Sequence, residues 1–348
     1  MKLGTEISWH DRRLRLPLER IRLSERWGYD AVFSAEGQGS DALTPLAYVA
    51  AVTNRLALGT CILPVTARPP AVAAQSFQTL DQLAGGGRVM IGLGSANPQA
   101  AEGWAGAPFG SRVERMRDYV AVMRAVASGG PVDYAGKALS VPYRGAGARG
   151  GAPVTSGLDT NPEMPIFVGC LGPKMIALAA EIADGWMPTA FNPRAFQYFK
   201  PMLEEGFARA GSGKGYADFQ IWAHLDVMVD DDVRAAMRPF KAFLATYIDY
   251  LRPTMDLLGL KAEADRVAEL TAAGRFEDAV EAIPDDYIDS GWLCGPLPRI
   301  REQLQPWLSS GATGLIVRYG PQVGANRHAP ENLEAFRVIA HALEKPGA

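Results

Sequence analysis

Short runs of β-type residues alternate with longer amphipathic runs along most of the chain. Alternation of strand and helix is typical of a parallel sheet built from strand–helix–strand units. We predict eight strands, each followed by helix, and this number favours an α/β fold closed as a (β/α)8 TIM barrel over an open doubly wound sheet. The predicted strands are 2–8, 31–34, 56–63, 88–93, 166–170, 185–188, 219–229 and 313–319.

Two segments interrupt this rhythm, although we expect residues 1–348 to form a single domain. Residues 129–165 are rich in Gly and Pro and show little periodicity, which predicts a long inserted loop. Such a loop is either a functional lid or substrate wall, or a mobile surface excursion, and the pattern leaves both open. Residues 231–284 have an almost wholly helical pattern, more than one crossover requires, and predict a helical insertion.

Composition excludes several functional classes. The 348 residues are 48% hydrophobic and 21% charged with a net charge of −3, so we expect no binding to nucleic acid or to an anionic membrane. Cys61, Cys170 and Cys294 lie far apart and outside any CxxC pair, which favours neither a disulfide framework nor a zinc site. The chain begins without an apolar signal segment and no stretch reaches about 18 apolar residues, so we expect a cytoplasmic protein.

In a barrel, the residues that follow the strands form the active site. Strand 31–34 is followed by Glu36, Ser40 and Asp41. A carboxylate at this place can orient a cofactor or move protons. Ser and Asp directly before a helix can instead accept hydrogen bonds from its free N–H groups. We interpret Asp41 as a capping residue and Glu36 as a functional residue.

Three other strand ends carry candidates. Cys61 has no histidine near it in sequence and is expected to be a small buried side chain. The glycines of 92–97 let backbone approach a ligand, although the segment is not GxGxxG. Pro173 suits the first position of a helix, whose N–H groups and dipole form a seat for phosphate; an ordinary strand–helix turn is the alternative. The four histidines have no metal-ligand spacing, and only one of them, His224, falls on a predicted strand.

Together these segments resemble the bacterial-luciferase-like family of flavin and deazaflavin oxidoreductases. The resemblance covers nearly the whole chain and is closest to the actinobacterial branch that uses the deazaflavin coenzyme F420. Each motif is weak alone, and together they are specific. They are Ala35-Glu36-Gly37, Gly39 to Pro45, Leu58-Gly59-Thr60, Asp81-Gln82-Leu83, Gly87-Arg88, Gly92-Leu93-Gly94, Pro98-Gln99, Glu102-Gly103-Trp104, Gly172-Pro173-Lys174 and Glu181 to Trp186.

The resemblance implies roles for individual residues. The Cys61–Ile62 bond matches a non-proline cis peptide behind the deazaflavin ring, and Asn97 matches a residue that contacts the cofactor's tail. Glu36 and Ser95 stand where the sugar-phosphate dehydrogenases of the family carry a histidine and a glutamate, which argues against glucose 6-phosphate as the substrate. We expect Glu36 to be catalytic and Ser95 to contact the cofactor. The turn that binds the cofactor phosphate is matched by Leu171, Gly172, Pro173, Lys174 and Met175.

The resemblance therefore implies an enzyme that transfers a hydride reversibly between C5 of coenzyme F420 and a small organic substrate, with the protein supplying binding and orientation. The family's habit implies a homodimer. A two-component monooxygenase that uses reduced FMN and oxygen is an alternative, and so is a flavin-binding protein that has lost turnover. The identity of the bound cofactor separates the first two, and hydride transfer separates both from the third.

Overall fold

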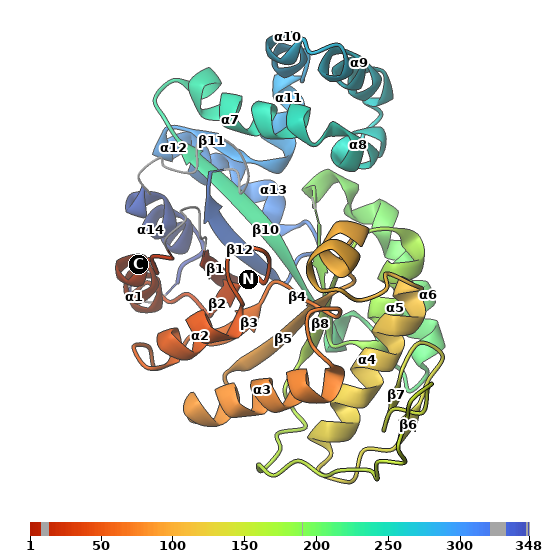
Figure 1. The fold of residues 1–348 in the computed structure, drawn as a ribbon. Coiled ribbons are helices and arrows are strands. Elements are labelled where there is room, and N and C mark those ends of the chain that lie inside the picture. Colours follow the sequence, from red (N-terminus) through yellow and green to blue (C-terminus); the bar gives the residue numbers. More distant parts are fainter. Residues whose placement is uncertain (8–13, 190, 321–331, 346, 348) are drawn as a thin grey trace. The chain divides into compact units, whose positions relative to one another are not determined.

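The structure is a computed structural model that describes residues 1–7, 14–189, 191–320, 332–345 and 347. The chain divides into two compact units. The first comprises residues 1–30, 188–201 and 221–348, and the second comprises residues 31–187 and 202–220. Figure 1 labels their helices and strands. Each unit contributes a set of parallel strands.

The second unit is built on parallel strands whose carboxyl ends lie along one edge. β2 pairs with β3, β3 with β5, and β5 with both β4 and β8, all in parallel. These strands are buried on both faces and carry mainly apolar side chains, as strands covered by crossover helices do. The bounds are β2 (Ala31–Ser34), β3 (Ala57–Thr60), β4 (Leu63–Pro64), β5 (Val89–Gly94), β8 (Ile166–Cys170) and β9 (Gly185–Pro188).

Crossover helices cover these strands, and α2, α3 and α4 are visible below them in Figure 1. α3 begins at Pro70, where the missing N–H of proline costs nothing, and Ser111 Oγ caps α4 by accepting a hydrogen bond from Glu114 N. Gly206 lets α6 approach α5, since a Cβ there would lie 2.2 Å from Ala177 O. The helices are α2 (Leu43–Ala50), α3 (Pro70–Leu83), α4 (Arg112–Ala127), α5 (Pro173–Ile182), α6 (Phe196–Ala210), which begins in the first unit, and the short η3 (Tyr216–Asp218).

Residues 129–165 are more ordered than the predicted loop. They contain a two-stranded antiparallel hairpin of β6 (Tyr134–Ala135) and β7 (Ser140–Val141). Asp118 of α4 is buried and accepts hydrogen bonds from Tyr134 Oη at 2.8 Å and from Ala138 N at 2.6 Å. The predicted loop therefore contains a short hairpin, and one buried carboxylate supplies the partners that fix this hairpin to the helix.

The described part of the first unit holds four parallel strands, in which β12 pairs with β1 and β10, and β10 also pairs with β11. Buried Arg20 of α1 ties the helix to β1 by donating to Thr5 Oγ1 and Glu6 O, both at 2.7 Å. The strands are β1 (Lys2–Ile7), β10 (Gln220–Val229), β11 (Leu293–Gly295) and β12 (Gly314–Tyr319). The helices of this unit that lie outside residues 231–292 are α1 (Leu18–Arg26), η2 (Pro193–Ala195), α12 (Leu297–Gln303), α13 (Gln305–Leu308) and α14 (Leu333–Ala342).

Helices α7 to α11 of this unit enclose a hydrophobic cluster, and Figure 1 shows them grouped together. Phe240 and Leu244 of α7 are fully buried there against Val267 of α9 and Ile288 of α11. The bounds are α7 (Val233–Thr246), α8 (Ile248–Asp256), α9 (Lys261–Ala272), α10 (Phe276–Glu281) and α11 (Asp285–Gly291). That these helices are an insertion into a single domain of residues 1–348 stays a prediction.

The structure corrects one predicted strand and adds one that was not predicted. The predicted strand 56–63 is interrupted at Cys61 and Ile62, which separate β3 from β4. β11 was not among the predicted strands, since its three residues are too few to show a period. No helix in the described parts of the chain is long and apolar enough to cross a membrane.

β3 and β5 approach closely at a glycine. Thr60 Oγ1 donates to Gly92 O at 2.7 Å and accepts from Gly92 N at 2.9 Å. A Cβ on Gly92 would lie 1.9 Å from the carbonyl oxygen of Thr60. The two strands therefore depend on the absence of a side chain at this position.

Gly92→Ala is expected to lower the free energy of unfolding by about 3 kcal/mol, because the added methyl forces β3 and β5 apart. Urea unfolding followed by circular dichroism measures this loss. Gly130→Ala is the control, since a Cβ there would meet no heavy atom within 4 Å. Equal stability of the two variants would contradict the close approach.

Candidate functional site

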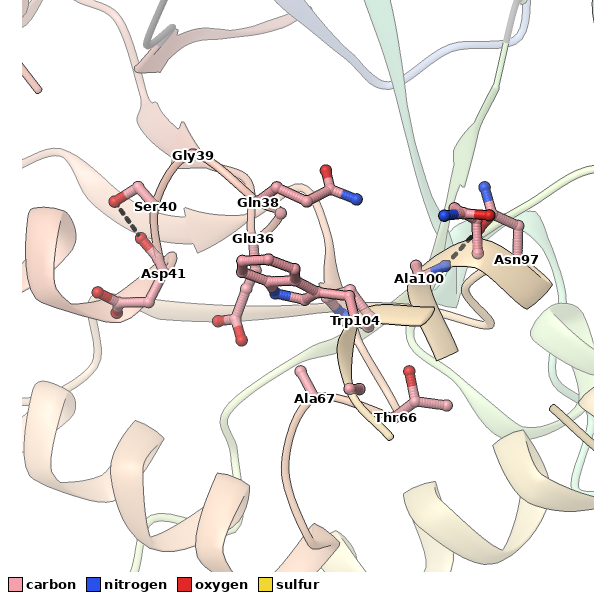
Figure 2. Close-up of a pocket in the computed structure, with 14 residues that line it drawn as sticks. Glu36, Gln38, Gly39, Ser40, Asp41, Thr66, Ala67, Asn97, Ala100 and Trp104 are labelled. Atoms are coloured by element: carbon pink, nitrogen blue, oxygen red, sulfur yellow. Dashed lines mark hydrogen bonds between the residues drawn. The ribbon is translucent and has the colours of Figure 1, made fainter. Parts of the chain in front are cut away.

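The carboxyl-end loops of the second unit surround a pocket of about 590 Å³. Because β2, β4 and β5 belong to one parallel set, the loops that follow them meet at the same edge. Figure 2 shows the pocket, with Trp104 in front and Glu36 beside it. Its lining residues are Glu36, Gly37, Gln38, Gly39, Ser40, Asp41, Pro64, Thr66, Ala67, Asn97, Gln99, Ala100, Trp104 and Ala105.

Glu36 is fixed to three other segments. Its backbone N–H donates to Ile62 O at 3.0 Å. Its side chain is 13% exposed, and Oε2 accepts from Ala42 N at 3.3 Å and from Arg68 Nη2 at 3.2 Å. Both hydrogen bonds to the carboxylate are accepted by Oε2, and within the described residues Oε1 lies outside them.

Asp41 caps the following helix, as predicted. Its Oδ1 accepts from Leu43 N at 3.0 Å and from Thr44 N at 2.8 Å. Ser40, the other polar residue before this helix, supports the loop instead, because its hydroxyl donates to Asp41 O at 3.0 Å. Asp41 therefore provides the predicted cap.

Cys61 and Ile62 form the segment between β3 and β4, at the carboxyl end of β3. The Cys61–Ile62 peptide bond is cis, as the family resemblance implies. Cys61 is buried and its N–H donates to Ser34 O at 2.8 Å. The Ile62 side chain fills the space left by two glycines, since a Cβ on Gly94 or on Gly169 would lie 2.4 or 2.5 Å from it. Ile62 thus packs against the ends of β5 and β8.

The loop after β5 leads into a π-helical turn, η1 (Gln99–Trp104). Asn97 Oδ1 accepts from Ala100 N at 2.8 Å and so holds the start of that turn. Ala96 has a φ of 61°, a conformation uncommon outside glycine, and Ser95 beside it is half-buried. Trp104 ends this turn and lines the pocket, and its side chain is 65% exposed.

The turn after β8 has the geometry of an anion seat. Gly172 has a φ of 92° and a ψ of 144°, a conformation almost confined to glycine, and a Cβ there would meet no atom within 4 Å. Met175 N and Ile176 N both donate to Gly172 O. Within the described chain, the N–H groups of Gly172 and Lys174 have no protein acceptor. Open backbone donors at a helix N-terminus suit a phosphate.

Cys170, the residue before this turn, is buried. Burial raises the pKa of its thiol to about 12, although Trp186 partly opposes the shift. Trp186 Nε1 also donates to Cys170 O at 3.1 Å and fixes the end of β8. The turn therefore starts from a rigid strand.

The structure brings some predicted site residues together and leaves others apart. Glu36 and Asn97 line the same pocket, and Ile62 is bonded to Glu36 through its backbone. Leu171 and Ser95 are half-buried, Pro173 and Lys174 are exposed, and Met175 is buried. The catalytic role of Glu36 and the cofactor-binding roles of the other nine residues remain predictions.

Sequence reasoning missed Arg68 and gave Trp104 no separate role. Arg68 lies in the loop before α3 and pairs with Glu36 and Asp41. A lone arginine before two prolines carries no signal for such a pairing. Trp104 stands six residues after the Asn97-Pro98 pair, at the end of a short turn that contains glycine. This position is only a weak signal that its indole is exposed.

A second polar cluster lies within the first unit and was also missed. Glu6 of β1 is buried, and its Oε2 lies 3.4 Å from His224 Nε2 and 3.6 Å from Arg318 Nη1. Arg318 also binds Asp226 in bidentate fashion at 2.6 and 2.8 Å. A carboxylate near the carboxyl end of a buried apolar strand was the available signal. His10 and His328 lie outside the described residues.

Opposing effects act on the pKa of Glu6. Burial raises it, but the hydrogen bond with His224 and the positive charge of Arg318 outweigh burial, and the pKa is lowered from its ordinary value of 4.5. The folded protein therefore holds an ionised Glu6. Among the described residues, no three His, Cys, Asp or Glu side chains gather to hold a metal ion.

Comparisons with known proteins extend this description. The family model of luciferase-like monooxygenases matches residues 2–314. A Mycobacterium tuberculosis protein named as a coenzyme F420-dependent oxidoreductase is 37% identical, with 92% of this chain and 95% of that protein covered. An F420-dependent glucose-6-phosphate dehydrogenase of Nocardia farcinica is 30% identical, with 80% and 78% covered. These names bear out the prediction of an oxidoreductase enzyme.

Solved structures establish the fold. The coenzyme F420-dependent tetrahydromethanopterin reductase from Methanopyrus kandleri has a TM-score of 0.78 at 23% identity, and 97% of each chain is covered. A monooxygenase from Streptomyces bottropensis has a TM-score of 0.66 at 19% identity, with 99% of each chain covered. The predicted (β/α)8 barrel is confirmed.

The lowered pKa of Glu6 predicts a pH-dependent contribution to stability. The contribution is complete above about pH 4.5 and is lost as pH falls through the lower, folded-state pKa. Glu6→Gln is expected to lower the free energy of unfolding by roughly 3 kcal/mol near neutral pH, because Arg318 and His224 lose a buried partner. The loss should shrink as pH falls below about 4.

Urea unfolding at a series of pH values measures this difference. Glu19→Gln, at an exposed position of α1, is the matched control and should follow the parent protein at every pH. A Glu6→Gln curve parallel to that of the parent from neutral to acid pH would refute the ionised cluster.

Proposed function

Because the chain belongs to the luciferase-like monooxygenase family, we propose that it transfers a hydride between coenzyme F420 and a small organic substrate. Membership confirms the family predicted from the sequence. The two relatives named above are F420-dependent by name, which supports the same cofactor here. That the enzyme works as a cytoplasmic homodimer is also part of the proposal and rests on the family resemblance and the sequence alone.

The turn at Gly172 is the observation that carries the cofactor assignment. Its backbone is open, its donors lack protein acceptors among the described residues, and it begins α5. Phosphate oxygens would be held there by the N–H groups of Gly172 and Lys174, with the exposed Lys174 ammonium nearby. The residues present therefore fit the phosphate of an F420 tail, and Asn97 at the neighbouring strand end would bind a further polar part of it.

F420, when bound, supplies the carbon atom that gives or takes the hydride. The chain's own contribution is binding, orientation and the movement of a proton. Glu36 is held through Oε2, and its Oε1 is available to accept a proton from a substrate oxygen or nitrogen, or to return it. The exposed indole of Trp104 and the side chain of Gln38 supply an apolar face and a hydrogen-bonding group in the same pocket.

Two other functions use the same fold. A monooxygenase with reduced FMN would need FMN bound in preference to the deazaflavin. A binding protein without turnover would hold the cofactor and transfer no hydride. Each differs from the proposal in one measurable property.

Titration of the purified protein with oxidised F420 and, separately, with FMN tests the proposal. We expect F420 to bind in the micromolar range or tighter and FMN to bind at least about tenfold more weakly, a difference of about 1.4 kcal/mol. Quenching of cofactor fluorescence measures both. Tight binding of FMN without binding of F420 would sink the proposal. After F420 binds, a panel of alcohols, enones and imines identifies hydride transfer, and binding without transfer to any of them would favour the non-catalytic alternative.

Gly172→Asp should weaken F420 binding by about 100-fold or more, since it places a carboxylate against the phosphate. Gly172→Asn is the matched control, because it has the same shape and backbone constraint without the charge. The ratio of the two dissociation constants isolates the electrostatic effect. If the Gly172→Asp and Gly172→Asn variants bind F420 with equal affinity, the phosphate lies elsewhere.

A further inference from the structure

Arg68 joins two carboxylates of the loop that follows β2. Its Nη2 lies 3.2 Å from Glu36 Oε2 and 3.5 Å from Asp41 Oδ1. The arginine side chain is 24% exposed and is absent from the residues that line the pocket. It therefore contacts the pocket through Glu36 and Asp41 and not directly.

The arginine itself is held from behind. Tyr119 of α4 is fully buried, and its hydroxyl donates to Arg68 O at 3.1 Å. Burial raises the pKa of Tyr119 well above its ordinary value, so the hydroxyl keeps its proton and remains a donor. Pro69 and Pro70 follow directly and fix the start of α3. The guanidinium thus extends from a rigid backbone.

The positive charge of Arg68 lies near two carboxylates and affects how Glu36 is oriented. Glu36 and Asp41 approach the same guanidinium, and without it two negative charges would face each other across a small gap. Asp41 is fixed independently because it caps α2. Glu36 would retain a single neutral donor, Ala42 N at 3.3 Å, and repulsion from Asp41 would turn it away. The orientation of Glu36 therefore depends on Arg68 more than that of Asp41 does.

We propose that Arg68 is a positioning residue: it holds the carboxylate of Glu36 toward the pocket and affects the reaction only through Glu36. This inference rests on the proposed function, in which Glu36 moves a proton at the bound substrate. A lysine would not replace the arginine fully, because an ammonium on a flexible stem lacks the fixed direction of the guanidinium, whose Nη2 lies near both carboxylates.

A double-mutant cycle tests the proposal. The four proteins are the parent, Arg68→Ala, Glu36→Gln and the double variant. A substrate-independent readout is the visible absorption band of bound F420, which responds to charge beside the ring. The second readout is the rate of hydride transfer to the substrate that the panel identifies. Urea unfolding of each variant without cofactor reports any loss of structure.

If Arg68 acts through Glu36, both single variants shift the absorption band in the same direction and lower kcat by about 100-fold. The double variant then resembles Glu36→Gln alone, because Arg68 has nothing left to position. Added guanidinium ion should restore part of the activity of Arg68→Ala and none of that of the double variant. Arg68→Lys should fall between the parent and Arg68→Ala.

Arg299→Ala is the control for loss of a partly buried ion pair. Arg299 is 29% exposed and pairs with Asp289 at 2.7 Å in the first unit. The Arg299→Ala variant should be less stable than the parent, and the absorption band of its bound F420 should be unchanged. This control separates a structural effect of removing an arginine from an effect on Glu36.

The outcomes distinguish the two proposals. An unchanged spectrum and rate for Glu36→Gln would refute the role of Glu36 in the proposed function. A clear effect of Glu36→Gln with none for Arg68→Ala, or with fully additive effects in the double variant, would refute the positioning role alone.

Discussion

The candidate site depends on the close approach of β3 to β5 at Gly92. The hydroxyl of Thr60 bonds both the N–H and the carbonyl of that glycine, so the end of β3 has one permitted position. The next two residues leave the strand, and Ile62 enters the space opened by Gly94 and Gly169. Its carbonyl then accepts the N–H of Glu36. A missing side chain on one strand thereby determines where a carboxylate stands on another loop.

Charge arrangement gives the two polar clusters different characters. Glu6 is buried with an arginine and a histidine, and its ionisation depends on them. Glu36 is partly exposed beside a pocket and keeps one oxygen outside its hydrogen bonds within the described chain. A buried carboxylate held between an arginine and a histidine stabilises a fold, whereas one with an available oxygen beside a pocket can exchange a proton with a ligand.

Much of the fold could be predicted because strand–helix alternation is a local signal. The capping by Asp41 was predictable for the same reason, since the residue stands directly before its helix. The hairpin of residues 134–141 was missed because its partner, Asp118, precedes it on a helix and gives no local pattern. The pairing of Arg68 with Glu36 joins residues 32 positions apart and depends on how two loops meet. Long-range contacts between single polar residues therefore could not be predicted from the sequence, whereas the motifs at the strand ends could be recognised in it.

Trp104 differs from the large buried indoles of this chain. Trp186, Trp222 and Trp307 are almost fully enclosed, whereas Trp104 is 65% exposed at the rim of the pocket. An indole in water emits at longer wavelength than one in an apolar core, so Trp104 contributes to the red edge of the emission together with the half-buried Trp27 and Trp292. The share of this emission that comes from Trp104 therefore reports what enters the pocket, and binding can be followed without a label or a reaction.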